Sequence, residues 1–138
     1  MIHGIGTDLT DTARIRAGLA RYGEAYAERM LAPAERAAFQ TSRDPARFLA
    51  KCFAVKEAFA KAVGTGLRAP VTLRNIAVLR DPLGRPFVEC APELAAWLAA
   101  RGISVHHVSL SDEGDFVLAF AVLEQAVPAD DQRTRNTP

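Results

Sequence analysis

The sequence of 138 residues has few cysteines, no long apolar run and almost no net charge. Two cysteines, Cys52 and Cys90, are too few for a disulfide framework, and their spacing is not that of a zinc site. No stretch reaches the roughly 18 apolar residues of a membrane-spanning helix. The N-terminus also lacks the basic and apolar regions of a signal peptide. We therefore predict a cytoplasmic protein with reduced cysteines and no membrane partner.

The composition is that of a folded domain rather than a disordered or nucleic-acid-binding chain. Hydrophobic residues make up 49% and charged residues 24%, ordinary values for a globular protein. Lys and Arg number 17 against 16 Asp and Glu, a net charge of +1. The strongly basic balance of a nucleic-acid binder is thus absent. We predict one domain over residues 1–124, followed by a polar, disordered tail over 125–138.

The charges are separated along the chain. Residues 12–51 carry eight basic and four acidic side chains, a net charge of +4. Residues 81–131 carry nine acidic side chains and two arginines, a net charge of −7. Such runs are often solvated helix faces. The alternative is that the basic stretch is a docking face for an acidic partner.

Apolar spacing, glycines and prolines predict an α+β fold with a mostly antiparallel sheet packed on a long helix. Gly4 and Gly6 in the first strand are expected to allow close backbone approach. The last strand is almost wholly apolar and is expected to be central and buried. The predicted strands are 2–9, 75–79, 86–90, 104–111 and 116–123; the predicted helices are about 11–21, two short helices between 24 and 41, 45–63 and 92–101.

The long helix, 45–63, carries the first candidate site residues. Glu57 and Lys61 are four residues apart and therefore share a face, on which a surface ion pair is the simplest interpretation. The surrounding positions are rich in alanine, which instead favours close packing of another element or a ligand. The helix is followed by Gly64-Thr65-Gly66. Free backbone N–H groups in that loop, with the Lys61 ammonium, would form a phosphate contact.

Asp8 is the second candidate, because it ends an otherwise apolar strand. By itself it fits a structural role at a helix start. Together with Glu57 it supplies a second carboxylate from a different element. Two carboxylates completed by phosphate oxygens are a common way to bind Mg²⁺.

The third candidate is the strand 104–111, in which two sets of side chains alternate between opposite faces. Val108 and Leu110 lie on one face with His106, and His107, Ser109 and Ser111 on the other. A lone strand histidine is usually structural. A row with one histidine and two serines beside a phosphate site would instead contact the ligand.

Three motifs occur in order over about residues 1–124: Ile5-Gly6-Thr7-Asp8-Leu9, a long motif from Phe53 to Gly66, and His107-Val108-Ser109-Leu110-Ser111-Asp112. They resemble the motifs of the holo-acyl-carrier-protein synthases, the short, trimeric branch of the 4′-phosphopantetheinyl transferases. The resemblance implies the fold of that family. It also implies a reaction of fatty acid biosynthesis, in which coenzyme A gives its 4′-phosphopantetheine to a serine of apo acyl carrier protein and releases adenosine 3′,5′-bisphosphate.

The resemblance further implies roles for the candidate residues. Asp8 and Glu57 would hold Mg²⁺, and Lys61 would balance phosphate charge. The loop Gly64-Thr65-Gly66, with His107 and Ser109, would contact coenzyme A. Either Asp8 or a metal-bound water would take the proton of the serine.

Family members are trimers with sites between subunits, so the resemblance implies a homotrimer in which the loop and His107 come from a different chain than Asp8. The acidic carrier protein would dock on the basic stretch, through Arg14 and through Arg21, two turns further along the same helix.

The sequence departs from many relatives at two positions. Cys52 stands where many have a basic residue, so one coenzyme A contact is either missing or supplied by Lys51 or Arg47. Asp112 stands where some have a histidine, which leaves its role open. Two other classes also remain open: another Mg²⁺-dependent phosphoryl-transfer enzyme, such as a diphosphate hydrolase, and a trimeric binding module without turnover.

Overall fold

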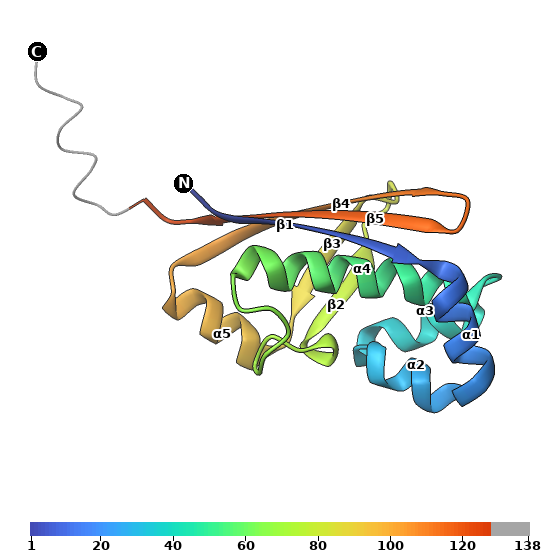
Figure 1. Cartoon of the computed structure of the whole chain (residues 1–138). Coiled ribbons are helices and arrows are strands. Elements are labelled where there is room, and N and C mark those ends of the chain that lie inside the picture. Colours follow the sequence, from blue (N-terminus) through green and yellow to red (C-terminus); the bar gives the residue numbers. More distant parts are fainter. Residues whose placement is uncertain (128–138) are drawn as a thin grey trace, which may run out of the picture.

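One long helix, α4 (Pro45–Val63), runs through the centre of the structure, a computed structural model that describes residues 1–127 (Figure 1). Twelve of its 19 residues are buried, so α4 is covered on most sides. The other elements are β1 (Ile2–Asp11), α1 (Thr12–Tyr22), α2 (Glu24–Met30), η1 (Pro33–Glu35), α3 (Arg36–Thr41), η2 (Leu73–Asn75), β2 (Ile76–Arg80), β3 (Pro86–Cys90), α5 (Pro92–Ala100), β4 (Ile103–Glu113) and β5 (Phe116–Gln125).

Two antiparallel sheets surround α4. The larger has the order β1-β5-β4 and covers one side of the helix, and the smaller is the β2–β3 hairpin. Helices α1 to α3 pack near one end of α4, and α5 packs against β3 and β4 (Figure 1). These findings confirm the predicted α+β fold with antiparallel pairing on a long helix. No helix among residues 1–127 is long and apolar enough to cross a membrane.

The ends of α4 follow from local chemistry. The Asp44 carboxylate accepts a hydrogen bond from the backbone N–H of Arg47, and Pro45 occupies the first turn. Gly64 ends the helix in the left-handed region, at a φ of 101°. The predicted bounds of 45 and 63 are therefore confirmed.

The first strand lies unusually close to α4. A Cβ added at Gly4 or Gly6 would overlap with the carbonyl oxygen of Ala62 or Ala58, respectively. Only glycine leaves room for this approach, as the sequence predicted. The consequence is that β1 places its side chains directly beside the site-bearing half of α4.

The central strand β5 is buried on one face only. Val117, Ala119, Ala121 and Leu123 are buried against α4. Phe116, Leu118 and Phe120 are 54%, 47% and 40% exposed on the opposite face. The prediction that this strand is central is confirmed, and the prediction that it is buried is wrong, because nothing within the described chain covers its outer face. When a strand is apolar at nearly every position, its sequence does not indicate which of its two faces is buried.

Other element boundaries agree with the sequence to within a few residues. Strand β1 continues to Asp11, and β4 begins at Ile103 and extends to Glu113. Gln125, predicted to begin the tail, belongs to β5, and its N–H donates to the carbonyl of Met1. The predicted tail residues 128–138 lie outside the described residues.

Candidate active site

Asp8 lies on the face of β1 that packs toward α4. It pairs in register with Ala119 of β5, whose side chain is buried under the sheet. The side chain of Asp8 is 15% exposed. Its Oδ2 accepts a hydrogen bond from the Thr10 hydroxyl at 2.6 Å. Asp8 is not a helix cap, because Asp11 fills that role for α1.

Glu57 of α4 lies near Asp8, and the like charges of the two carboxylates repel each other. Partial burial raises the pKa of Glu57 above its usual range, and the negative charge of Asp8 raises it further. Lys61 acts in the opposite direction without cancelling these effects. Two carboxylates from separate elements thus face one region, as the sequence predicted.

Lys61 contacts β1 instead of its helical neighbour. Its Nζ donates to the carbonyl oxygen of Thr7 at 2.9 Å and lies 3.5 Å from Oδ1 of Asp8. Among residues 1–127, no ion pair joins Lys61 to Glu57. The interpretation as a surface ion pair along the helix is therefore wrong. Asp8, Glu57 and Lys61 form one cluster. The Lys61 side chain lies at the edge of this cluster and is 53% exposed, so a ligand can reach it.

The cluster has the donor chemistry of a divalent cation site. Carboxylate oxygens are the hard ligands that Mg²⁺ prefers, and a cation between Asp8 and Glu57 would relieve their repulsion. Within residues 1–127, no three His, Cys, Asp or Glu side chains gather closely enough to bind a metal by themselves. A cation at two carboxylates would keep open positions for water and phosphate oxygens.

The loop after α4 differs from its expected form. The N–H groups of Gly64 and Gly66 both donate to the carbonyl oxygen of Ala60, at 3.2 Å each. The expectation that these two groups are free for a phosphate is wrong, because they cap the helix C-terminus. The Thr65 hydroxyl also donates to the Gly66 carbonyl. Any ligand contact of this loop must use other groups.

His107 and Ser109 are exposed on β4, on the face opposite to Asp8. They pair in register with Val122 and Phe120, which lie on the outer face of the sheet. The ring of His107 lies 2.8 Å from the Glu124 carboxylate. This confirms the predicted alternation along the strand. A single chain does not bring His107 and Ser109 together with Asp8.

His106, on the inner face of β4, has a structural role. Its ring packs edge-on against Phe59 of α4, with the ring centroids 5.5 Å apart. Burial lowers the pKa of His106, and its neighbour His107 lowers it further. A neutral ring in this position completes the apolar packing under the sheet.

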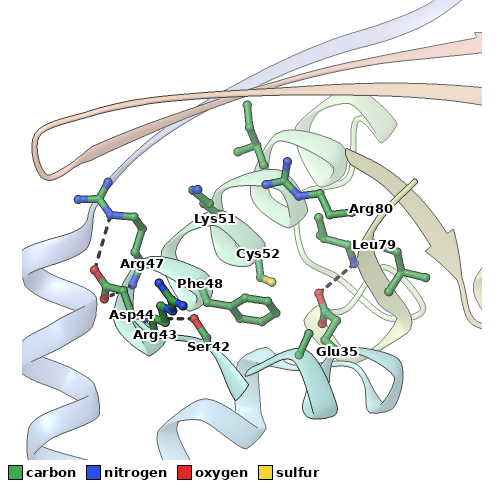
Figure 2. A pocket seen from close by; sticks show the side chains of 13 residues that line it. Glu35, Ser42, Arg43, Asp44, Arg47, Phe48, Lys51, Cys52, Leu79 and Arg80 are labelled. Carbon is green, nitrogen blue, oxygen red and sulfur yellow. Dashed lines mark hydrogen bonds and ion pairs between the residues drawn. The ribbon is translucent and has the colours of Figure 1, made fainter. Parts of the chain in front are cut away.

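A cavity of about 530 Å³ lies beside the N-terminal half of α4 (Figure 2). Phe48 and Leu79 contribute to its apolar wall, and Cys52 and Glu35 lie deep within it. Its basic side chains are Arg43, Arg47, Lys51 and Arg80. The cavity therefore combines an apolar interior with a cationic rim.

The two departures from the family pattern meet at this cavity. Cys52 is buried, and burial together with the Glu35 carboxylate raises the pKa of its thiol well above the usual range. It therefore does not replace a basic contact. Asp112 accepts from Arg47 at 2.9 Å and lies 3.7 Å from the Nζ of Lys51. In this chain, Asp112 is the counter-ion of the two basic residues.

The sequence analysis did not predict the buried ion pair of the core. Lys56 and Glu35 are both fully buried and are bonded to each other. A signal was available, since Lys56 lies four residues after Cys52 and three before Phe59, within the apolar stripe of the helix. A lysine in such a stripe requires a buried partner.

The predicted docking residues are accessible. Arg14 and Arg21 are both exposed on α1, and neither has an ion-pair partner among the described residues. Their neighbour Arg16 differs, because it is bonded to both carboxylate oxygens of Asp44 at 3.0 and 3.3 Å. Two arginines of α1 are thus available to an acidic surface, and one is used internally.

Comparisons with known proteins show the family of the chain. A model described as the 4′-phosphopantetheinyl transferase superfamily matches residues 4–121. The chain is 72% identical over 131 residues to the holo-[acyl-carrier-protein] synthase of Thiobacillus denitrificans, covering 95% of this chain and 100% of that protein.

Solved structures show the same similarity. The holo-[acyl-carrier-protein] synthase of Neisseria meningitidis has a TM-score of 0.88 and 49% identity, with 91% of this chain and 100% of that chain covered. The Bacillus anthracis synthase, solved in complex with CoA (3′,5′-ADP), has a TM-score of 0.75 and 33% identity. The match covers 91% of this chain and 99% of that chain. The chain therefore belongs to the 4′-phosphopantetheinyl transferase superfamily and, within it, to the holo-[acyl-carrier-protein] synthases.

Proposed function

We propose that this protein transfers the 4′-phosphopantetheine of coenzyme A to a serine of apo acyl carrier protein, with Mg²⁺ as cofactor. The observation that carries the proposal is the convergence of Asp8, Glu57 and Lys61, two repelling carboxylates and one exposed ammonium at the edge of the sheet. Synthases from Bacillus anthracis and Helicobacter pylori have been solved with coenzyme A, which supports the choice of donor.

In the proposed reaction, a carrier serine attacks the β-phosphorus, the pantetheine-bearing atom of the diphosphate. The P–O bond to the α-phosphate breaks, and adenosine 3′,5′-bisphosphate leaves with the electron pair. Asp8 and Glu57 would hold Mg²⁺, which would neutralise charge on the diphosphate oxygens. Lys61 is anchored by the Thr7 carbonyl and turns its ammonium to the same region, where it balances charge on the transferred phosphate.

The serine proton goes to a general base. Asp8 is the candidate side chain, because its carboxylate lies in the proposed site and its Oδ2 is oriented by the Thr10 hydroxyl. Because its pKa is raised, Glu57 takes up a proton at a higher pH than an ordinary glutamate does, and a protonated carboxyl is a poor metal ligand. Transfer should therefore fall as Glu57 becomes protonated.

The assembly we propose is a homotrimer with sites between subunits. The outer face of the larger sheet exposes Ile5 (61%), Leu9 (65%), Phe116 and Phe120, an apolar patch that association would cover. His107 lies on this same face, so subunit contact would place it beside a neighbouring chain. In the proposed trimer, His107, Ser109 and the loop Gly64-Thr65-Gly66 contact coenzyme A bound at the Asp8 site of the neighbour.

The cationic cavity supplies the remaining phosphate contact in this proposal. Arg47 is already bonded to Asp112 and to the Gly114 carbonyl. Lys51 is 3.7 Å from the same carboxylate, and its side chain is 30% exposed. Lys51 is therefore the better candidate for the contact that Cys52 does not make.

The carrier protein is proposed to dock on α1 through Arg14 and Arg21. The location is proposed to be the cytoplasm, where free thiols such as those of Cys52 and Cys90 are usual.

One experiment separates this function from its rivals. The full chain is incubated with coenzyme A, Mg²⁺ and an apo acyl carrier protein, and the carrier is weighed by mass spectrometry. We expect the carrier to gain one phosphopantetheine group. Release of phosphopantetheine without a modified carrier would indicate a diphosphate hydrolase, and binding without any product would indicate a binding module.

A further inference from the structure

A second lysine–carboxylate pair lies within the core, away from the proposed site. It joins Lys56 of α4 to Glu35 of η1. The ammonium of Lys56 donates to Glu35, to the carbonyl oxygen of Met30 at 2.6 Å and to that of Leu73 at 2.9 Å. An ammonium has three donors, so all of them are used. The pair cannot accept a ligand, and any role it has in function must act through its neighbours.

Glu35 connects the same pair to two further segments. Its Oε1 accepts from the backbone N–H of Ala32 at 2.7 Å, and its Oε2 accepts from that of Val78 at 2.9 Å. Lys56 of α4 is thereby bonded directly to the end of α2, to η1 and to η2, and through Glu35 it is linked to β2. The pair fixes the direction in which Lys56 points.

That direction determines where Glu57 points. Lys56 and Glu57 are consecutive in α4, so their side chains diverge by about 100° around the helix axis. A helix with Lys56 fixed toward η1 and β2 has Glu57 fixed toward β1. Any rotation of α4 would move Glu57 relative to Asp8, which is carried by a separate strand.

The opposite side of α4 packs closely against β1. At Gly4 and Gly6 the strand meets the carbonyl oxygens of Ala62 and Ala58, and this contact fixes how close the helix lies to the strand. The bonds of Lys56 are directional and lie on the other side of the helix, so they add a polar constraint on the rotation of α4.

We propose that Lys56 is a positioning residue: through its bonds to Glu35, Met30 and Leu73 it sets the rotation of α4 that brings the Glu57 carboxylate opposite Asp8. This inference rests on the proposed function, because it takes the Asp8–Glu57 pair as the Mg²⁺ site. Lys56 itself touches neither metal nor substrate.

The test is Lys56→Met combined with Glu35→Gln, which leaves no buried charge and keeps similar side-chain lengths. Mg²⁺ is titrated by calorimetry into the full-length protein saturated with coenzyme A. We expect Mg²⁺ affinity to fall by about tenfold or more, as on loss of a residue that orients a metal ligand. The KM for the carrier should remain unchanged, because α1 and its arginines are not part of the bonded group.

The matched control is Leu94→Ala on α5, a helix that packs against β3 and β4. Leu94 is fully buried, so this variant lowers the unfolding temperature without touching α4's polar bonds. We expect its Mg²⁺ affinity to equal that of the wild type. Equal losses of affinity in the control and the double variant would overturn the proposal, as would wild-type affinity in the double variant.

A third variant covers the case in which the double variant does not fold. Glu35→Gln retains the Lys56 ammonium and its two carbonyl partners, and should weaken Mg²⁺ binding in the same direction but less. Wild-type affinity in this variant would then overturn the proposal. Failure of the wild type itself to bind Mg²⁺ or to modify the carrier would instead refute the proposed function.

Discussion

Two lysine–carboxylate groups on the same helix differ in almost every physical respect. Lys56 and Glu35 are fully buried, and each has hydrogen-bond partners. Lys61 is about half exposed, and the two carboxylates beside it, Asp8 and Glu57, repel each other. The Lys56–Glu35 pair, whose hydrogen bonds are all made, joins segments of the core. The unsatisfied group of Asp8, Glu57 and Lys61 retains uncompensated charge and open space for a ligand. Function is expected where charges are incompletely compensated.

The largest effect should come from removing a carboxylate of the unsatisfied group. Asp8→Asn and Glu57→Gln should each reduce transfer by about a thousandfold, because loss of metal assistance costs several kcal/mol in the transition state. The rate is measured on the purified carrier at a fixed Mg²⁺ concentration. Unchanged circular dichroism shows that the fold is intact. Near-normal transfer by either variant would remove that residue from the metal site.

Lys61→Ala should have the next largest effect. Loss of a charge-assisted bond to phosphate should lower kcat/KM for coenzyme A by roughly tenfold to a hundredfold. The comparison is Lys51→Ala, which removes a cation from the cavity rim and should raise the KM for coenzyme A with kcat unchanged, whereas Lys61→Ala should also lower kcat. If Lys61→Ala alters only thermal stability, its bond to Thr7 is structural and the lysine has no part in transfer.

Charge reversal on α1 should have a smaller effect, confined to the carrier. Arg14→Glu should raise the KM for the carrier roughly threefold to tenfold, with that for coenzyme A unchanged, since an exposed charge contributes about 1 kcal/mol. Arg16→Gln on the same helix is the matched control, because Arg16 is already paired with Asp44. The wild-type rate at low carrier concentration should also fall with salt. A salt-independent wild type would place the carrier elsewhere.

The smallest expected effect is on stability. The folded-state pKa of Glu57 is raised above its ordinary value of 4.5, so its ionisation destabilises the folded protein as pH rises through the folded pKa. Without Mg²⁺, Glu57→Gln should therefore unfold at a slightly higher temperature than the wild type at neutral pH. The difference should vanish below pH 4.5, where the wild-type carboxyl is protonated in both states. A lower unfolding temperature at neutral pH would contradict the repulsion.

Local signals were enough to predict much of this molecule from its sequence. Asp44-Pro45 and Gly64 predicted the ends of α4, and Gly4 and Gly6 predicted its close contact with β1. Two properties depended on contacts between distant segments. Glu35 approaches Lys56 only after folding, and the outer face of β5 is exposed because no described segment covers it.

A third property, the use of the Gly64 and Gly66 N–H groups, is local but was also not predicted. A glycine-rich loop has the same composition whether its N–H groups bind a phosphate or cap a helix, and the geometry decides between them.

The most direct test of the central claim is a calorimetric titration of Mg²⁺ into the wild type and into Glu57→Gln, both saturated with coenzyme A. If Asp8 and Glu57 form the metal site, the wild type binds Mg²⁺ with an affinity that weakens as pH falls toward 4.5, and the variant shows no comparable binding. Equal Mg²⁺ affinity in the two proteins would contradict the account.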